Sequence, residues 1–364
     1  MKNILYVTTI SNTINSFLVP HIALLLKQGH QVSVACRVKE TLHPSLEKVI
    51  VYDLPFERRP FHKNNLKAYR QFKNIINKNF FDIVHTHTPI ASAIVRFACR
   101  NQASKVFYTA HGFHFFEGAP LKNWLVYYPV ERVLARHTDV LMTINEQDTK
   151  IAQTFSANKI VHIPGIGFDW HRYQIKDTIA REQLRRELNI PIEAKVMISI
   201  GELNDNKNHL TGIKALAKMK EPIFYLICGS GDHLPRLQGE VQKHGLTERV
   251  IFLGNVPNVR KYLNIADFSL FISKREGLGL AGLEAMASGL PLISSFVGGI
   301  RDYTQNNITG ITIRQPENVA EVTAAIQQVV NYSPNQKKNI GGNNRKIAAR
   351  YQLDYAVEAV NKFY

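Results

Sequence analysis

The sequence predicts an α/β protein with two domains, each built on a parallel β-sheet. The chain has 364 residues, which is more than a single hydrophobic core usually supports. In both halves, apolar runs of strand length alternate with amphipathic helical patterns, as is typical of βαβ units. Hydrophobic residues make up 45% of the chain and charged residues 20%, which is ordinary for a globular protein.

The first βαβ unit is predicted at the start of the chain. In order, the sequence favours a strand over Ile4–Thr8, a polar loop up to Ser16, a helix over Phe17–Gly29 and a strand over Gln31–Cys36. Because ligands bind beyond the carboxyl ends of parallel strands, we expect this loop to face a ligand. Its hydrogen-bonding side chains, Asn12, Asn15 and Ser16, are candidate ligand contacts.

Further strands are predicted along the whole chain. In the first half they are Val49–Tyr52, Ile83–His85, Lys105–Thr109 and Thr138–Asn145. In the second half they are Val196–Ile200, Ile223–Cys228, Val250–Gly254 and Phe268–Ile272. The second half therefore repeats the architecture of the first, with different loops.

The segment 273–291 has the pattern of a glycine-rich loop followed by a short helix. Gly277 and Gly279 permit a sharp turn with backbone N–H groups close to a ligand. A helix over 280–288 follows, and its free N–H groups favour an anion. Glu276 at the strand end and Glu284, expected in the first helical turn, are suited to accept hydrogen bonds from sugar or ribose hydroxyls. The pattern fits a sugar nucleotide; alternatively, the glycines only make a tight turn and Glu284 caps its helix.

Cysteine usage and hydropathy give expectations about the compartment. Cys36, Cys99 and Cys228 lie in apolar segments, so we expect buried free thiols in a reducing environment. The N-terminus begins with a strand pattern rather than a signal peptide, and no stretch approaches about 18 apolar residues. A soluble, cytoplasmic protein is predicted.

The net charge of +16 is most concentrated between Arg58 and Phe81, a stretch without acidic residues. Apolar residues are interleaved with its cations at roughly helical spacing. The candidate membrane contacts are Arg58, Arg59, Lys63, Lys67, Arg70 and Lys73. One interpretation is docking on anionic lipid; the other is a surface helix with an apolar core face and a solvated basic face. Nucleic acid binding is disfavoured because no nucleic-acid-binding module is recognised.

Histidines and aromatic residues gather after two of the predicted strands. His85, His87 and His114 could suggest a metal cluster, but no carboxylate or cysteine ligands occur at fixed spacing. The aromatic residues, from Phe113 to Phe116 with Trp124, Tyr127 and Tyr128, form either a wall that faces a ligand or part of a core.

The chain resembles the retaining GT-B glycosyltransferases, the group 1 family that includes glycogen synthase-like and sucrose synthase-like enzymes. The resemblance is carried by Glu276, seven intervening residues and Glu284, then Ala-Met-Ala-Ser-Gly-Leu-Pro and the pair Gly298-Gly299. It extends over nearly the whole chain and is strongest to bacterial capsule and exopolysaccharide glycosyltransferases. It implies two Rossmann-like domains facing a central cleft. Residues 1–169, completed by a helix over 347–364 that crosses back, would form the acceptor-side domain, and residues 170–346 the donor-binding domain.

The resemblance also implies roles for individual residues. His111 would lie near the donor sugar ring, Glu276 would hold sugar hydroxyls, and Lys207 would neutralise the diphosphate. Glu284 would bind the ribose and Val256 the edge of the base. The other donor-binding candidates are Gly201, Glu202, Gly229, Gly277, Leu278, Gly279 and Leu280. On the acceptor side the candidates are Asn12, Asn15 and Ser16, which could alternatively meet a donor phosphate, and Phe113, whose aromatic cluster would form an acceptor-side wall.

One position departs from the family pattern. Glu202 stands where the family usually carries an arginine that shares the diphosphate charge with Lys207. Because cationic stabilisation of the leaving group is the main expected catalytic effect, Lys207 must rely on backbone N–H groups or on another cation such as Arg301.

The implied function is retaining, metal-independent transfer of a hexosyl or N-acetylhexosaminyl group, without a cofactor. The donor would be a nucleotide-sugar, with a UDP-sugar favoured, and the acceptor a lipid-linked (polyprenyl diphosphate) saccharide at the inner face of the plasma membrane. A homodimer stays open. The alternatives are a catalytically silent sugar-nucleotide-binding partner, which Glu202 would explain, and a GT-B-type sugar-nucleotide epimerase.

Overall fold

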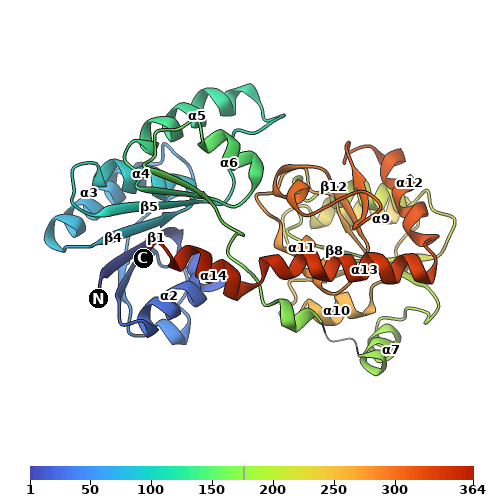
Figure 1. The fold of residues 1–364 in the computed structure, drawn as a ribbon. Coiled ribbons are helices and arrows are strands. Elements are labelled where there is room, and N and C mark those ends of the chain that lie inside the picture. Colours follow the sequence, from blue (N-terminus) through green and yellow to red (C-terminus); the bar gives the residue numbers. More distant parts are fainter. Residues whose placement is uncertain (175–176) are drawn as a thin grey trace. The chain divides into compact units, whose positions relative to one another are not determined.

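The computed structural model describes residues 1–174 and 177–364, and the chain divides into two compact units (Figure 1). The N-terminal unit comprises Met1–Gly167 and Asp354–Tyr364, and the C-terminal unit comprises Phe168–Leu353. The chain leaves the first unit after Gly167, close to the expected residue 169, and returns to it at Asp354 rather than at the expected residue 347. In each unit one sheet, parallel throughout, carries helices on both faces.

The sheet of the N-terminal unit has seven strands in the order β3-β2-β1-β4-β5-β6-β7. The strands are β1 (Asn3–Ile10), β2 (Gln31–Arg37), β3 (Ile50–Asp53), β4 (Ile83–His87), β5 (Lys105–Ala110), β6 (Val140–Thr143) and β7 (Lys159–His162). The order reverses direction at β1 and β4, whose carboxyl ends therefore border the crevice where ligands bind in such sheets.

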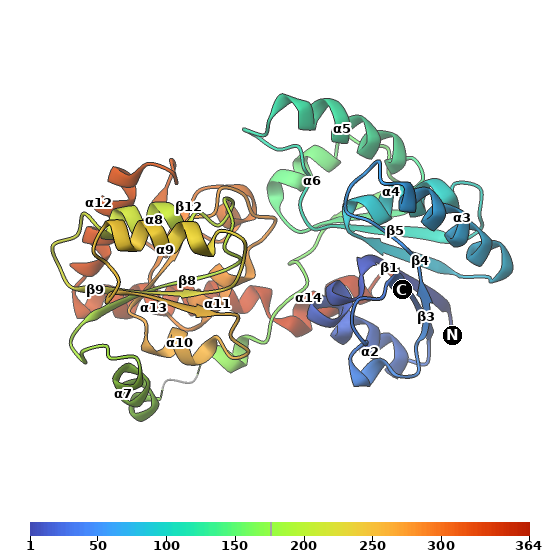
Figure 2. The ribbon, with the colours of Figure 1, turned by 180° about the vertical axis from the view of Figure 1, so that it is seen from behind.

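Helices cover both faces of this sheet (Figures 1 and 2). One face carries α2 (Val19–Lys27) and α14 (Leu353–Asn361), and the other carries α3 (Lys63–Lys78), α4 (Pro89–Cys99), α5 (Leu121–Ala135) and α6 (Glu146–Ala152). The last residue, Tyr364, lies beside β1 and β4, where its hydroxyl donates to the Tyr6 hydroxyl over 2.5 Å. The C-terminal segment is thus part of the core of this unit.

The polar loop expected after Thr8 is absent. β1 continues to Ile10, and a helical turn, α1 (Ser11–Thr13), leads through a π-helical turn (Ile14–Leu18) into α2. Ile14 and Leu18 are buried on the core side of this segment, so their packing extends the helix towards its N-terminus through a polar sequence. The prediction failed because polarity was taken as a loop signal, although only one side of these turns faces solvent.

The sheet of the C-terminal unit has six strands in the order β10-β9-β8-β11-β12-β13. They are β8 (Lys195–Ile200), β9 (Ile223–Cys228), β10 (Val250–Gly254), β11 (Phe268–Phe271), β12 (Leu292–Ser295) and β13 (Gly310–Ile313). Three short strands, β7, β12 and β13, were not predicted. Each has four residues, as do β3, β6 and β11, which were predicted, so strand length alone does not account for the omission.

The helices of the C-terminal unit also form two layers (Figures 1 and 2). One layer holds α8 (His209–Leu216), α9 (Leu234–Lys243) and α12 (Val319–Val330); the other holds α10 (Arg260–Ile265), α11 (Leu280–Ala287) and α13 (Pro334–Ala348), with α7 (Thr178–Glu187) beside α10. The expected single C-terminal helix is two helices. A 3₁₀ turn (Ala349–Tyr351) and extended Gln352 end α13 before α14 begins.

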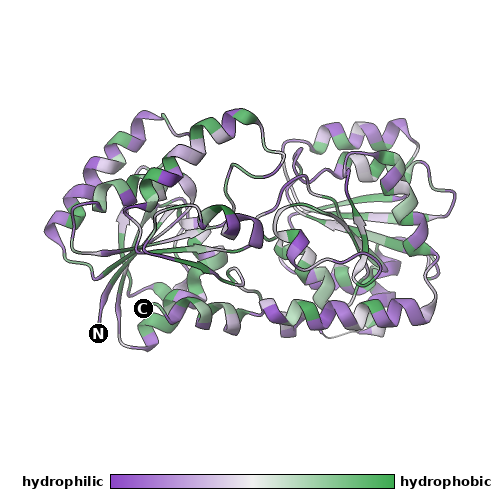
Figure 3. Ribbon diagram, turned by 45° about the horizontal axis from the view of Figure 1, so that its top comes forward, coloured by the Kyte–Doolittle hydropathy of each residue, from purple (hydrophilic) through white to green (hydrophobic). Residues whose placement is uncertain are grey.

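Each unit has its own apolar core, and the strands are its most hydrophobic elements (Figure 3). The three cysteines are free and buried, as predicted. Among the described residues, no helix combines the length and apolar character required to cross a bilayer.

Candidate active site

The carboxyl edge of the C-terminal sheet is assembled by glycines that allow loops to touch. A Cβ on Gly229, after β9, would lie 1.9 Å from the carbonyl oxygen of Gly201, after β8. Likewise, a Cβ on Gly299, after β12, would lie 2.1 Å from the carbonyl oxygen of Gly277, after β11. Since no side chain fits at either contact, these glycines are required for the loops to pack together.

Lys207 and Glu276 meet at this edge. Lys207 Nζ donates to Glu276 Oε1 over 2.5 Å, and the two side chains are 21% and 13% exposed. The aliphatic part of Lys207 runs along Gly201, where an added Cβ would lie 3.0 Å from the lysine Cδ. Asn206 fixes the loop of Glu276 by donating to the Arg275 carbonyl over 3.0 Å. Two residues 69 positions apart in the sequence thus form one ion pair in a ligand-accessible position.

The loop of Glu276 rests on aromatic side chains. Gly279 has φ of +85°, and a Cβ there would lie 2.6 Å from the Phe271 ring. The Tyr303 hydroxyl donates to the Gly279 carbonyl over 3.2 Å. The backbone entering α11 is therefore held in place by these rings, with Leu278 buried and Leu280 at the first position of the helix.

Glu284 lies on α11 in the second turn rather than the first, because the helix begins at Leu280. It does not cap the helix, since its carboxylate is hydrogen-bonded to the side chain of Tyr173. Burial raises the pKa of this carboxyl to about 7, although Tyr173 and the charge of Arg172 oppose the rise. Near neutral pH this group is therefore present both as a protonated carboxyl, which can donate a hydrogen bond, and as a carboxylate, which only accepts.

The remaining donor-side candidates lie in loops at the same edge. Val256 is half-buried after β10, and Glu202 is exposed after β8, where it accepts a hydrogen bond from Asn204 over 3.0 Å. Arg301 donates to the Phe296 carbonyl over 2.9 Å, and its guanidinium lies 5.0 Å from the Phe296 ring. The charge of Glu202 is thus directed to solvent, while Arg301 is held beside the Gly298-Gly299 turn.

In the N-terminal unit, the buried His85 and His87 and the half-buried His111 form a chain at the carboxyl ends of β4 and β5. His87 Nδ1 and His111 Nε2 are 3.0 Å apart, and His85 Nε2 lies 2.8 Å from the Thr109 hydroxyl. His85 also contacts the Tyr364 hydroxyl. Burial, reinforced by neighbouring histidines, holds the pKa of His85 and His87 well below its usual range and lowers that of His111 to about 4.

These histidines are therefore neutral at physiological pH and serve as hydrogen-bonding groups. Among residues 1–174 and 177–364 there is no group of three or more histidine, cysteine, aspartate or glutamate side chains placed to hold a metal ion. His114 is separate from the chain and stacks on Tyr127 with 4.7 Å between ring centroids.

The predicted acceptor-side residues have different outcomes. Asn12 and Asn15 both donate to the Glu40 carboxylate, over 2.6 and 2.9 Å, so they tie the first helical turn to the segment after β2. Ser16 is exposed. Phe113 is only 3% exposed and packs on Phe115 within the core, so for Phe113 the prediction of an acceptor-side wall is wrong and the core alternative holds.

The basic stretch forms a surface helix, α3, with a core face that includes Phe72 and Ile76. The cations Lys63, Lys67 and Arg70 are exposed, and Lys73 is half-buried. Arg58 and Arg59 are also exposed, in the loop before the helix, rather than on it. The amphipathic helix is confirmed, while contact with lipid stays a prediction.

Sequence reasoning missed two hollows at the carboxyl edge of the N-terminal sheet. One, of about 270 Å³, is lined by side chains that include Thr9, Thr88 and His114. The other, of about 650 Å³, is lined by Arg37, Lys39, Arg58 and Arg59 together with Glu57 and other residues. Their cations come from the end of β2 and from the segments after β2 and β3, so only the strand order brings them together.

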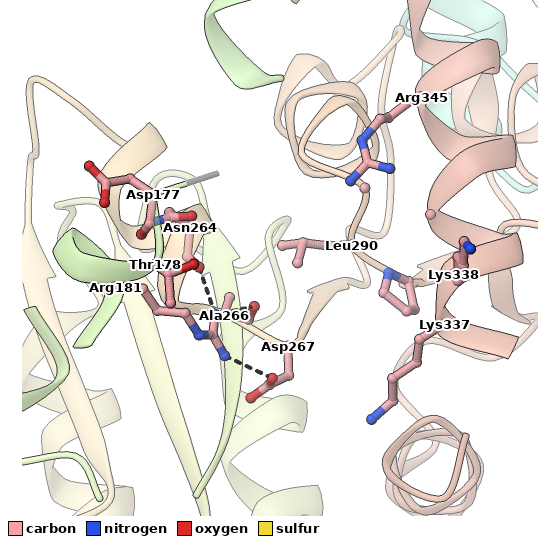
Figure 4. Close-up of a pocket in the computed structure, with 13 residues that line it drawn as sticks. Asp177, Thr178, Arg181, Asn264, Ala266, Asp267, Leu290, Lys337, Lys338 and Arg345 are labelled. Atoms are coloured by element: carbon pink, nitrogen blue, oxygen red, sulfur yellow. Dashed lines mark hydrogen bonds and ion pairs between the residues drawn. The ribbon is translucent and has the colours of Figure 1, made fainter. Parts of the chain in front are cut away.

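A further pocket, of about 400 Å³, lies at the opposite edge of the C-terminal sheet (Figure 4). Asp267 and Pro291, which immediately precede β11 and β12, form part of its lining. Arg181 reaches Asp267 over 3.0 Å, and Arg185 reaches the second carboxylate oxygen over the same distance. These contacts attach α7 to the sheet, and this pocket is separate from the Lys207–Glu276 edge.

Comparison with known proteins identifies the family. EpsD of Bacillus subtilis (strain 168), whose name assigns it to the glycosyltransferases, is 34% identical over 371 residues, covering 100% of this chain and 96% of that protein. Family models described as "Glycosyl transferases group 1" and "Glycosyl transferase 4-like" match residues 180–347 and 3–145. The chain is a group 1 glycosyltransferase. An Escherichia coli relative, UDP-Gal:alpha-D-GlcNAc-diphosphoundecaprenol alpha-1,3-galactosyltransferase, is 26% identical, covering 82% of this chain and 79% of its own.

Solved structures establish that this glycosyltransferase has the GT-B fold. Anabaena Alr3699/HepE, in complex with UDP and glucose, has a TM-score of 0.81 at 18% identity, covering 100% of this chain and 99% of its own. Sucrose-phosphate synthase from Thermosynechococcus elongatus has a TM-score of 0.84 at 18% identity, covering 100% and 98%. The predicted family and fold class are thus confirmed.

Proposed function

We propose that this glycosyltransferase moves a hexosyl or N-acetylhexosaminyl group from a UDP-sugar to a lipid-linked saccharide during synthesis of a capsule or exopolysaccharide. The observation that carries the proposal is the Lys207–Glu276 pair at the carboxyl edge of the C-terminal sheet. A cation for a diphosphate and an acceptor for sugar hydroxyls stand side by side there, as a nucleotide-sugar requires. The complex of HepE with UDP and glucose and the UDP-Gal donor of the E. coli relative support a UDP-sugar donor, and the diphosphoundecaprenol acceptor of the E. coli relative supports a diphosphate lipid acceptor.

The donor's arrival would redistribute this ion pair. The diphosphate competes with Glu276 for Lys207 Nζ, and the freed carboxylate then accepts hydrogen bonds from hydroxyls of the transferred sugar. Glu284 accepts from the ribose in its ionised form, and the base lies near Val256. Backbone N–H groups of the 277–280 loop share the diphosphate charge with Lys207, which compensates for Glu202 at the family's arginine position.

The proposed reaction retains the configuration of the anomeric carbon. The bond from this carbon to the diphosphate oxygen breaks, and the bond to the acceptor oxygen forms on the same face. The acceptor hydroxyl gives its proton to the departing phosphate oxygen, so no separate carboxylate nucleophile is used, unlike in most glycosidases. His111 stays neutral and is proposed to contact the donor sugar. Neither a metal ion nor another cofactor takes part in this proposal.

The place of action that fits this acceptor is the inner face of the plasma membrane, with the protein bound peripherally. The exposed cations of α3 support attraction to anionic lipid. A homodimer is compatible with this proposal.

The decisive experiment is release of nucleoside diphosphate from UDP-, GDP- and ADP-sugars, with and without chelator, in the presence of a lipid-linked acceptor extract. Wild type is compared with Glu276→Ala and Lys207→Ala, and exposed Lys218→Ala serves as the matched control. We expect chelator-resistant release from one donor, lost in both site variants and kept in the control. Binding without release would favour a silent partner, and conversion of the donor to its epimer would favour an epimerase.

A further inference from the structure

Two hollows of opposite character meet on the N-terminal unit. The first is the hollow of about 650 Å³ described above, here called the cationic hollow because Arg37, Lys39, Arg58 and Arg59 line it. The second is a groove of about 870 Å³ between α3, α4 and α5, here called the apolar groove. His62 lines both of them. The two therefore adjoin at the start of α3.

The cationic hollow presents positive charge on a braced loop. The side chains of Lys39, Arg58 and Arg59 make no hydrogen bond or ion pair with any residue in the described part of the chain, whereas Arg37 pairs with Glu57. Asn65, only 7% exposed, accepts from the Glu57 N–H over 2.9 Å and donates to the Arg59 carbonyl over 2.8 Å. The two neighbouring guanidiniums thus stand on a fixed backbone, ready for a multiply charged anion such as a diphosphate.

The apolar groove exposes hydrophobic side chains to solvent. Phe61 is 95% exposed, Leu66 56% and Val133 56%. The other lining residues are mainly apolar, no acidic residue is among those that the structure assigns to the groove, and the charged residue on its rim is Lys63. Contiguous exposed apolar surface of this kind marks a binding site for hydrocarbon or for a partner.

The cationic hollow also adjoins the smaller hollow of about 270 Å³ at the end of β1, because Thr9, Ile10 and Arg58 line both. The smaller hollow is polar enough for a saccharide, with Thr9, Thr88 and His114 in its wall. Around the edge of the sheet a hydroxyl-lined hollow, a cationic hollow and an apolar groove thus follow one another. A saccharide, a diphosphate and a hydrocarbon chain follow each other in the same order in a lipid-linked sugar.

We propose that the cationic hollow binds the diphosphate of a polyprenyl-diphosphate-linked saccharide and that the apolar groove holds the first isoprene units of its chain. This inference rests on the lipid-linked acceptor proposed above and assigns residues to it. Arg58 and Arg59 act on the diphosphate rather than on the general bilayer surface. Leu66 and Val133 contact the chain, which leaves the groove towards the membrane.

The test uses the full-length protein and three probes: farnesyl diphosphate, inorganic diphosphate and farnesol, with affinities measured by calorimetry. The cation variant is Arg58→Gln/Arg59→Gln, and its control is Lys67→Gln/Arg70→Gln, two exposed cations of α3 outside both linings. The groove variant is Leu66→Ser/Val133→Ser. Its control is Leu121→Ser/Leu125→Ser, two residues of α5 that are 72% and 68% exposed but do not line the groove.

We expect wild type to bind farnesyl diphosphate at least about tenfold more tightly than either partial probe, because charge and hydrocarbon contribute together. The cation variant should bind farnesyl diphosphate and inorganic diphosphate about tenfold more weakly than wild type does. The groove variant should bind farnesyl diphosphate and farnesol about tenfold more weakly. Both controls should bind as wild type does. Equal losses in a variant and its control, or no saturable binding of farnesyl diphosphate, would overturn the proposal.

Two further arms distinguish this site from a bulk-lipid surface and from an acceptor site on an inactive protein. In the first arm, all four variants are tested for binding to phosphatidylglycerol vesicles. If the variants affect vesicle binding as they affect farnesyl diphosphate binding, and farnesyl diphosphate does not compete with the vesicles, the surface binds bulk lipid and the proposal is overturned. The second arm compares farnesyl diphosphate binding with release of nucleoside diphosphate from the donors. If the variants change farnesyl diphosphate binding as expected but the wild type releases no nucleoside diphosphate from any donor, the site is supported and the proposed transfer is refuted.

Discussion

The raised pKa of Glu284 makes the stability of the C-terminal unit depend on pH in a direction opposite to that of most carboxylates. The folded protein holds this proton up to about pH 7, whereas the ordinary pKa of a glutamate, which applies to the unfolded chain, is 4.5. Between these values the folded state binds more protons than the unfolded state, so the stabilising effect is complete below pH 4.5 and is lost as pH rises through 7. The difference between the two pKa values corresponds to about 3 kcal/mol of unfolding free energy.

Replacing Glu284 with glutamine removes this pH dependence while keeping a side chain that can hydrogen-bond to Tyr173. We subtract the unfolding free energy of wild type from that of Glu284→Gln. As pH rises from 5 to 8.5, this difference should increase by about 2–3 kcal/mol, after allowance for the partial exposure of Glu284. The assay is urea unfolding at a series of pH values, followed by a probe in the C-terminal unit. The comparison uses the difference between the two proteins, in which all other titrations cancel.

Glu248→Gln is a suitable control, because Glu248 is an exposed carboxyl of the same unit, and its difference from wild type should stay nearly constant. A wild-type minus Glu284→Gln difference that is flat from pH 5 to 8.5 would refute the reasoning. The same titration bears on the proposed donor site: the ionised carboxylate is the better acceptor for ribose hydroxyls, so UDP affinity should rise through pH 7 in wild type and not in Glu284→Gln.

Three further predictions concern packing and charge. A double-mutant cycle on Lys207→Ala and Glu276→Ala should give a coupling of about 1–2 kcal/mol in unfolding free energy, because the Nζ to Oε1 distance is 2.5 Å. A coupling near zero would mean that the pair does not form in solution. Gly298→Ala should abolish donor turnover and lower the melting temperature, because its Cβ would lie 2.1 Å from the Glu276 carbonyl oxygen. The control Gly342→Ala, with open space around the added Cβ, should keep wild-type turnover and melting temperature. Wild-type turnover in Gly298→Ala would contradict the close packing. Arg96→Met should destabilise the N-terminal unit by about 3–5 kcal/mol, because it leaves the carboxylate of Glu131, 2.8 Å away, without its buried partner. In thermal denaturation, Arg96→Met/Glu131→Gln should recover part of this loss of stability. Equal stability of the two variants would argue against a charge effect.

The sequence by itself determined the class of fold and the glycine-rich loop at the candidate donor edge. Long apolar runs such as Ile223–Cys228 predict buried strands because a parallel sheet is covered on both faces. The glycine loop before α11 could be predicted because Gly277, Gly279 and Glu276 are close in sequence, and the conformational requirement of a tight turn is local. Cysteine burial was also predictable from the apolar segments around each thiol.

Only the tertiary structure decided which distant residues meet. The ion pair of Lys207 with Glu276 depends on β8 and β11 being neighbours, and the burial of Phe113 depends on its packing against Phe115 and Phe155. The raised pKa of Glu284 comes from burial and is partly opposed by Tyr173, and neither effect can be read from helical position. Likewise, the cations of the N-terminal hollow come from chain segments that follow different strands. Charge and burial act through space, whereas sequence patterns report only what lies within a few residues along the chain.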